Sequence, residues 1–260
     1  MKKPPVVILC GGRGTRFREQ TESRPKPMIE VCGKPILWHL MSFYAAQGFN
    51  DFILCLGYKG DFIKQYFLHH TAMTNDFTID LSKPDQIEFH GSARQDWRIT
   101  CVDTGADTLT GARVKKIEKF IDGDQFLLTY GDGLADVDVQ ATVDFHNKHG
   151  KAVTVTGVRP QSRFGELQVD GDAVQSFSEK PDVQHGYING GFFVMDKKTM
   201  SYLTTDEKCI LEREPLENIA NDGELMIYKH HGYWQCMDTY RDLMLLESEW
   251  NSGVAPWKKW

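Results

Sequence analysis

The sequence lacks several features that would place the protein in a membrane, on nucleic acid or outside the cell. No stretch of its 260 residues approaches the ~20 consecutive apolar residues of a membrane helix. Basic residues are not in excess: the formal net charge is −6, which gives no support for a nucleic-acid or anionic-membrane partner. The six cysteines include no CxxC pair, so we expect reduced thiols in a cytoplasmic protein rather than disulfides or zinc.

Repeats and low-complexity tracts are also absent. Short, continuously apolar runs, typical of strands buried on both faces, alternate with segments whose apolar residues recur at helical spacing. The predicted strands are Val6–Cys10, Phe52–Leu56, Arg98–Val102, Gln125–Tyr130, Ala152–Val158, Leu167–Val169, Val174–Phe177, Phe192–Met195 and Leu225–Lys229. The predicted helices are at 36–47, 61–69, 110–120, 139–149, 198–203, 213–221 and 240–250. We expect an irregular excursion with one hairpin at 70–98 and a second hairpin around the Gly171-Asp172 turn. The order predicts one Rossmann-like α/β domain over 1–260, with a mixed, mostly parallel sheet and helices on both faces.

A glycine-rich loop, Gly11-Gly12-Arg13-Gly14-Thr15-Arg16, directly follows the first predicted strand. Ligands of open α/β sheets bind at the carboxyl ends of strands, and glycines let backbone N–H groups approach phosphate oxygens closely. The loop does not end in the Gly-Lys-Ser/Thr of a P-loop, and the dinucleotide fingerprint that would start at Gly12 fails at Phe17. From the loop alone, phosphate binding and a plain structural turn both stay open.

A lysine between two prolines, in Pro25-Lys26-Pro27-Met28, comes shortly after this loop. Because proline fixes φ and pushes the residue before it towards an extended conformation, we expect Lys26 to lie on a stiffened segment. GGxGTR followed by PKPM resembles the signature of the sugar-1-phosphate nucleotidyltransferases, whose fold is of the nucleotide-diphospho-sugar transferase type. The resemblance implies that the loop holds nucleotide phosphates, with Arg16 on the β- and γ-phosphates and Lys26 on the α-phosphate.

Two aspartates stand where predicted strands end. Asp132 lies between glycines after Gln125–Tyr130, and Asp238 follows the strand-like Tyr233–Cys236. Carboxylates suit Mg²⁺, which takes few protein ligands together with substrate phosphates. Each aspartate also has a structural explanation, which for Asp238 is the N-cap of a helix that begins just after it. The family resemblance assigns both residues to a Mg²⁺ site.

The second half of the chain, from about residue 151, carries Glu179-Lys180-Pro181 and Asn189-Gly190-Gly191. By itself each motif is typical of a surface turn. In the resembled family, Glu179 would accept hydrogen bonds from sugar hydroxyls, Lys180 would neutralise the sugar phosphate and Asn189 would contact the sugar ring, which agrees with the chemistry of these groups. Residues 1 to about 150 would then be the nucleotide-binding half.

The base is expected to be read by Asp103-Thr104-Gly105 and Thr110-Gly111-Ala112-Arg113. These segments and the tail Ala255-Pro256-Trp257-Lys258 resemble the bacterial glucose-1-phosphate cytidylyltransferases, over nearly the whole chain. The resemblance implies CTP and α-D-glucose 1-phosphate as substrates, Arg16, Lys26 and Lys180 as catalytic residues, and a homo-oligomer, with a hexamer as one option. It implies nucleotide contacts for Leu9, Gly11, Gly12, Gly14, Thr15, Arg16, Lys26, Thr108, Arg113 and Gly131.

Alternatives of two classes remain. The same fold and chemistry could serve another base or another sugar 1-phosphate, or the chain could be a catalytically silent, nucleotide-sugar-binding regulatory subunit. The intact set of charged motif residues argues against a silent copy. His146 and His149 are three residues apart on a predicted helix, but no third ligand stands out, and a solvated helix face is the simpler explanation.

Overall fold

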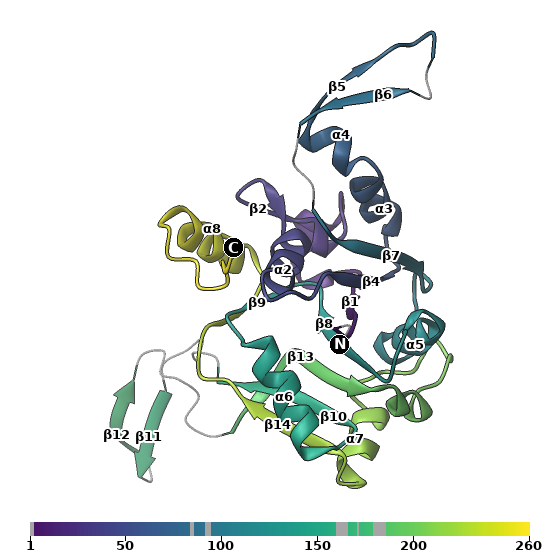
Figure 1. Cartoon of the computed structure of the whole chain (residues 1–260). Coiled ribbons are helices and arrows are strands. Elements are labelled where there is room, and N and C mark those ends of the chain that lie inside the picture. Colours follow the sequence, from purple (N-terminus) through teal and green to yellow (C-terminus); the bar gives the residue numbers. More distant parts are fainter. Residues whose placement is uncertain (1–2, 84–85, 92–94, 160–165, 171, 179–185) are drawn as a thin grey trace.

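The computed structural model describes residues 3–83, 86–91, 95–159, 166–170, 172–178 and 186–260, and its centre is a seven-stranded sheet in the order β14-β10-β13-β8-β1-β4-β7 (Figure 1). The strands are β1 (Val6–Leu9), β4 (Asp51–Leu56), β7 (Arg98–Asp103), β8 (Gln125–Tyr130), β10 (Val153–Val158), β13 (Ile188–Asp196) and β14 (Leu225–Lys229). Neighbouring strands pair in parallel, except that β13 runs antiparallel to β8 and β10. The predicted mixed, mostly parallel sheet is confirmed.

Side chains of β1 alternate between two hydrophobic layers, one on each face of the sheet. Val6 and Ile8 pack in one layer, whereas Val7 and Leu9 pack in the other. Helices α2 (Ile36–Ala45), α3 (Gly60–Leu68), α6 (Val139–His149) and α8 (Tyr240–Asn251) contribute to the first layer, and α5 (Thr110–Lys116) and α7 (Glu214–Asn221) to the second. A strand covered on both faces is continuously apolar, which explains the sequence of β1.

The helix bounds agree with the sequence prediction except in the middle of the chain. The helix expected over 110–120 ends at Lys116, and a 3₁₀ turn follows at Glu118–Phe120. The amide of Ile117 bonds to the carbonyl of Val114, three residues back, which tightens the last turn and ends the α-helix. The segment expected as a helix at 198–203 is likewise a 3₁₀ helix, Lys197–Tyr202.

A small antiparallel pair outside the main sheet brings distant parts of the chain together. Strand β9 (Gly133–Ala135) pairs with β15 (Trp234–Cys236), with Cys236 opposite Gly133. The amide of Met237 donates to the carbonyl of Asp132 at 2.9 Å, which extends this pairing by one bond. The pair therefore places Asp132 beside Asp238, although more than a hundred residues separate them in the sequence.

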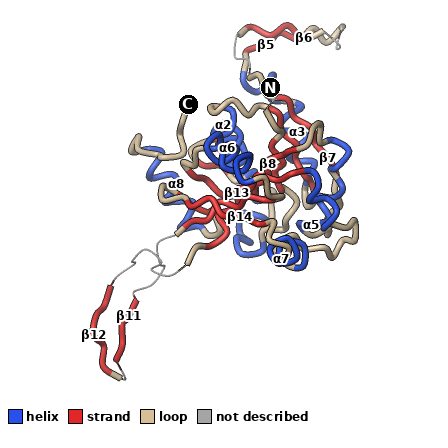
Figure 2. Tube along the Cα trace, turned by 60° about the horizontal axis from the view of Figure 1, so that its bottom comes forward, coloured by secondary structure: helices blue, strands red, loops and turns tan. Residues whose placement is uncertain are grey.

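Within the excursion expected at 70–98, the described residues 70–83 and 86–91 form an arm that projects from the body of the molecule (Figures 1 and 2). It contains α4 (His70–Thr74), which was not predicted, and the predicted hairpin, formed by β5 (Asp76–Ile79) and β6 (Ile87–His90). Large apolar side chains on the hairpin are exposed, including Phe77 and Phe89, whose rings pack against each other. The second predicted hairpin is β11 (Glu166–Asp170) with β12 (Ala173–Ser178).

Both halves of the sequence contribute strands to the main sheet: β1, β4, β7 and β8 come from the first half, and β10, β13 and β14 from the second. That the chain is one domain stays a prediction. The remaining elements are α1 (Arg18–Thr21), a 3₁₀ turn at Thr15–Phe17 and the pair β2 (Glu30–Val31) and β3 (Lys34–Pro35). All six cysteines are free thiols. Among the described residues, no helix combines the length and apolar character needed to cross a bilayer.

Candidate active site

A cavity of about 350 Å³ opens where β1 and β8 end side by side, with Leu9 opposite Tyr130. This is the edge of an α/β sheet at which ligands bind, and the volume falls within the range of small-molecule sites. The residues predicted from sequence that line it are Leu9, Gly11, Gly12, Gly14, Thr15, Lys26, Thr108, Arg113, Gly131, Asp132 and Asp238. The side chain of Arg16 and residues Glu179 and Lys180 lie outside the described residues.

The glycine loop is shaped by a buried arginine beneath it. A Cβ atom on Gly11 would lie 2.2 Å from the guanidinium of Arg113, so this position admits only glycine unless Arg113 moves. Gly14 has φ +60° and a Cβ there would meet Thr21 at 2.7 Å. The loop therefore runs close over Arg113 and Thr21, with its backbone along the wall of the cavity.

Arg113 donates all its described hydrogen bonds to oxygens of the protein itself. Its Nη1 donates to Leu56 O, Thr104 Oγ1 and Gly105 O, and its Nη2 donates to Gly11 O at 3.0 Å and Ala106 O at 3.4 Å. The side chain is buried, and burial lowers its pKa. These bonds tie the glycine loop to β4 and to the start of α5. A direct contact of Arg113 with the base stays a prediction.

Lys26 begins a short 3₁₀ helix, Lys26–Met28, so the expectation that it is extended was wrong. The extended residue is Pro25, at φ −69° and ψ 150°, which precedes the turn. A proline near the start of a helix needs no backbone donor, and Pro27 is therefore accommodated without a lost hydrogen bond. The two prolines still stiffen the segment, and the Lys26 side chain is directed into the cavity wall.

The ammonium of Lys26 bridges the two predicted aspartates. Its Nζ lies 2.6 Å from Asp132 Oδ2 and 2.6 Å from Asp238 Oδ1, and only 10% of its side chain is exposed. Burial acts to lower the pKa of Lys26, but the two carboxylates outweigh burial and the pKa is raised. A lysine with a raised pKa stays charged near neutral pH, so it presents a permanent positive charge to the cavity.

The structure excludes the helix N-cap as the role of the Asp238 side chain. The N-cap of α8 is Thr239, which forms a reciprocal capping box with Asp242. The carboxylate of Asp238 is therefore not the helix cap and bonds instead to Lys26. Asp242 also accepts from the Asp238 amide at 3.0 Å, which holds the backbone at this turn.

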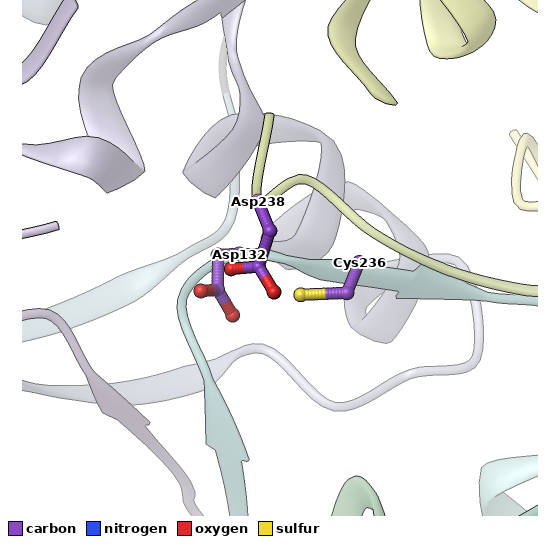
Figure 3. A group of neighbouring side chains, drawn as sticks. All are labelled: Asp132, Cys236 and Asp238. Carbon is purple, nitrogen blue, oxygen red and sulfur yellow. The ribbon is translucent and has the colours of Figure 1, made fainter. Parts of the chain in front are cut away.

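The side chains of Asp132, Asp238 and Cys236 point toward one another from the ends of β8 and β15, and their ligand atoms lie within 4.8 Å (Figure 3). The two carboxylates already neutralise one positive charge, that of Lys26. Two hard oxygen donors beside an open cavity fit a magnesium ion, whereas the sulfur of Cys236 is too soft to be a magnesium ligand. Burial, followed by the charge of Asp132, raises the pKa of the Cys236 thiol.

On the far side of β8, Asn189 at the start of β13 reaches the cavity residue Tyr130. Its Nδ2 donates to the Tyr130 hydroxyl at 3.3 Å, and its Oδ1 accepts from the Gly191 amide at 2.8 Å. Gly191 has φ +80°, and a Cβ there would lie 2.5 Å from the Tyr130 ring. The Asn-Gly-Gly motif thus packs against the residue just before the Gly131-Asp132 turn, and is not a free surface turn.

Thr108 and Gly131 both line the cavity. Thr108 is buried, and its hydroxyl accepts from Lys116 Nζ at 3.0 Å and donates to Glu207 at 3.4 Å. The amide of Gly131 donates to Leu9 O at 3.1 Å, which continues the β1–β8 pairing into the turn. Sequence reasoning gave no role to Tyr130, although it lies directly before the Gly131-Asp132-Gly133 motif, and it missed Glu207 and Glu212 because no local motif marks them.

The expectation that His146 and His149 form a solvated helix face was wrong for His146. His146 is only 1% exposed, and its two ring nitrogens lie 2.9 Å from Thr154 Oγ1 and 3.1 Å from Asp196 Oδ1. His149 contacts the same threonine hydroxyl at 2.7 Å. A hydroxyl that bonds to both rings explains the pair without a metal, and the pair lies apart from the cavity residues.

Comparisons with known proteins agree with this geometry. The family model described as nucleotidyl transferase matches residues 5–244. A glucose-1-phosphate cytidylyltransferase of Salmonella typhi is 46% identical over 256 residues, which cover 98% of this chain and 99% of the relative. A mannose-1-phosphate guanylyltransferase of Mycobacterium tuberculosis is 30% identical over 96% of this chain and 66% of its own length. The crystal structure of HddC from Yersinia pseudotuberculosis covers 95% of this chain and 100% of its own with a TM-score of 0.70, at 24% identity, which shows the shared fold.

Proposed function

This chain belongs to the nucleotidyl transferase family, and we propose that it transfers the cytidylyl group of CTP to α-D-glucose 1-phosphate, giving CDP-glucose and pyrophosphate. The substrates follow from the 46% identity to a named glucose-1-phosphate cytidylyltransferase, which extends over 98% of the chain. The observation that carries the chemistry is the Lys26 ammonium between Asp132 and Asp238, beside the glycine loop.

The reaction requires no general base. A sugar phosphate is a dianion near neutral pH, because its second pKa is about 6, so one of its oxygens attacks the α-phosphorus directly. The bond from that oxygen to phosphorus forms while the bond to the bridging oxygen of pyrophosphate breaks, in line and on the opposite side. Catalysis then depends on positioning and on neutralising charge that accumulates around the α-phosphorus.

Lys26 is the residue best placed to neutralise that charge. It is held at the carboxyl end of the sheet, next to the loop whose backbone lines the cavity. We propose that Arg16 assists on the β- and γ-phosphates and that Lys180 neutralises the sugar phosphate, with Glu179 on the sugar hydroxyls. These three roles are inferred from the family resemblance of their motifs.

Asp132 and Asp238 are the proposed ligands of a Mg²⁺ ion, which would supply positive charge beside the triphosphate. The two carboxylates share one lysine, so they keep an excess of one negative charge that can attract a further cation. The nucleotide contacts proposed for Leu9, Gly11, Gly12, Gly14, Thr15, Thr108, Arg113 and Gly131 are supported by the fact that all of them line the same cavity.

We also propose that the protein acts as a homo-oligomer. The projecting arm supports this proposal, because Phe77, Ile79, Ile87 and Phe89 are each at least 40% exposed on a two-stranded hairpin. An isolated hairpin with apolar side chains in water is marginally stable, and a second copy of the chain would cover it. The size of the oligomer can be measured by light scattering.

The test is a panel of sugar 1-phosphates offered with CTP and Mg²⁺, read by pyrophosphate release and by mass spectrometry of the product. Glucose 1-phosphate should give CDP-glucose at the highest kcat/KM. A silent regulatory subunit would bind the nucleotide without releasing pyrophosphate for any sugar. Faster turnover with another sugar 1-phosphate would mean that this sugar is the acceptor, while the proposed nucleotidyl transfer would stand.

A further inference from the structure

A carboxylate that no sequence motif marks, Glu212, lies at the junction of the nucleotide and sugar sides of the site. It stands two residues before α7 and is half-buried. Its Oε1 accepts from the Tyr130 hydroxyl at 2.5 Å, and its Oε2 accepts from Thr110 Oγ1 at 2.6 Å. Tyr130 and Thr110 both line the cavity, so one carboxylate joins two of its walls.

The hydrogen bonds around Glu212 can run in only one direction. An ionised carboxylate has no proton to give, so both hydroxyls must donate to it. The Tyr130 oxygen then has only lone pairs left, and these accept from Asn189 Nδ2 at 3.3 Å. The Asn189 Oδ1 is left to accept from the Gly191 amide at 2.8 Å. The orientation of the Asn189 carboxamide is therefore fixed from two sides, by the Gly191 amide at its oxygen and by Glu212, acting through Tyr130, at its nitrogen.

The position of Asn189 places this relay on the side from which the acceptor must come. Strand β8 lies between β1, which carries the glycine loop, and β13, which begins just before Asn189. With nucleotide phosphates along the loop, the second substrate has to reach the α-phosphorus from the β13 side. Asn189 is exposed there, whereas the Tyr130 hydroxyl already has its donor and its acceptor.

We propose that Glu212 is a positioning residue for the sugar 1-phosphate, which acts through Tyr130 to hold the Asn189 carboxamide in one orientation. This inference rests on the proposed function and deepens it. Glu212 touches no substrate; its second bond, to Thr110, ties the relay to the first residue of α5. The amide of Leu211 donates to that same threonine hydroxyl at 3.0 Å, which fixes the carboxylate's own segment.

The packing of the Tyr130 ring supports this arrangement. The ring of Tyr130 is held against Gly191, where any Cβ would collide with it. The hydroxyl consequently has little freedom to seek another partner.

The substitution Glu212→Gln keeps the shape but replaces one acceptor oxygen by a donor, so Tyr130 and Thr110 can no longer both donate to residue 212. Because the Leu211 amide already donates to Thr110 Oγ1, we expect that hydroxyl to keep its proton on the glutamine oxygen, with the NH₂ group facing Tyr130. The proton of Tyr130 then opposes the Asn189 Nδ2 donor and weakens the hold on the carboxamide. We expect KM for glucose 1-phosphate to rise about tenfold, the order of one misplaced hydrogen bond, with smaller changes in kcat and in KM for CTP. Glu214→Gln, an exposed residue on the same segment, is the matched control and should leave all three parameters unchanged.

A double-mutant cycle separates positioning from a merely structural role. Tyr130→Phe keeps the ring and deletes the hydroxyl, so it should raise the same KM, and Glu212→Gln in that background should add nothing further. Additive effects of the two changes, or a lowered melting temperature with an unchanged KM, would overturn the proposal. If the wild-type protein makes CDP-glucose and only the KM prediction fails, the proposed function stands; if the wild type makes none, both fall.

Discussion

Among the side chains that the structure describes, two cations, Arg113 and Lys26, line the cavity, and the protein holds them in opposite ways. Arg113 is buried with its described donors on oxygens of the protein, four of them main-chain carbonyls, whereas Lys26 is held between two carboxylates. Main-chain carbonyls cannot leave Arg113 without breaking β4 and the glycine loop. The carboxylates of Asp132 and Asp238 can be taken over by another cation. The comparison predicts that Arg113 mainly fixes the shape of the proposed nucleotide site, whereas the partners of Lys26 can be exchanged during the reaction.

The largest effect should come from the carboxylates on the Lys26 side. Asp132→Asn and Asp238→Asn each remove a negative charge that a metal would need, and kcat should fall by about 100- to 1,000-fold. Steady-state kinetics at saturating Mg²⁺ measures this. The control is Asp138→Asn, because Asp138 caps α6 and asparagine caps equally well. Near-normal turnover in either cavity variant would make that aspartate structural.

The two proposed phosphate lysines should differ in kind. Lys26 is proposed to contact charge that grows in the transition state. Lys26→Ala should therefore raise the activation free energy by about 2–4 kcal/mol, which lowers kcat, with a small change in KM for glucose 1-phosphate. Lys180 would hold a phosphate that is charged throughout, so Lys180→Ala should mainly raise that KM. Kinetics with both substrates varied decide this, and Lys119→Ala is the surface control. The same defect in the same parameter would contradict the division into two halves.

Arg113 should behave as part of the scaffold. Lysine cannot reproduce the fork of donors, so Arg113→Lys should lower the free energy of unfolding by about 2 kcal/mol, as expected for hydrogen bonds to a charged group. Denaturant titration measures it, with Arg98→Lys as control, since the exposed Arg98 side chain forms an ion pair with Asp51 at the surface end of β4. A variant that keeps wild-type stability but loses CTP binding would move Arg113 to the reactive side.

The smallest effect concerns competition for the carboxylates. If Lys26 occupies the place of a metal ion, Lys26→Met should bind Mn²⁺ about tenfold more tightly than the wild type in the absence of nucleotide, a change of about 1.4 kcal/mol. Calorimetric titration with Mn²⁺ gives the two affinities. Weaker or unchanged binding in the variant would show that lysine and metal do not share these oxygens.

Sequence reasoning anticipated the Lys26 side better than the Arg113 side, for a physical reason. Glycine loops, prolines and strand-end aspartates are local patterns, so Lys26, Asp132 and Asp238 could be predicted to meet. Arg113 also stands in a recognisable segment, but its partners are backbone carbonyls, which no side-chain pattern encodes.

Other parts of the site depend on pairings that only the fold creates. Glu212 reaches Tyr130 from more than eighty residues away, and Cys236 is brought to the carboxylates by the β9–β15 pair. The apolar strand patterns predicted the main sheet. The strands β9 and β15 have only three residues each, too few to show an alternation of apolar and polar residues. His146 was wrongly predicted to be solvent-exposed, because a polar residue on a helix can be buried when the fold supplies a hydrogen-bond partner such as Thr154.

Choice of nucleotide tests the central claim most directly. With glucose 1-phosphate and Mg²⁺, kcat/KM should be highest for CTP, and it should exceed that for UTP by about 10- to 100-fold, the value of one well-placed hydrogen bond. GTP, ATP and dTTP should be poorer still. Mixed-substrate competition between CTP and UTP, read by mass spectrometry, gives the ratio of CDP-glucose to UDP-glucose in one vessel. A product mixture that follows the supplied nucleotide ratio, with no preference for cytidine, would contradict the account.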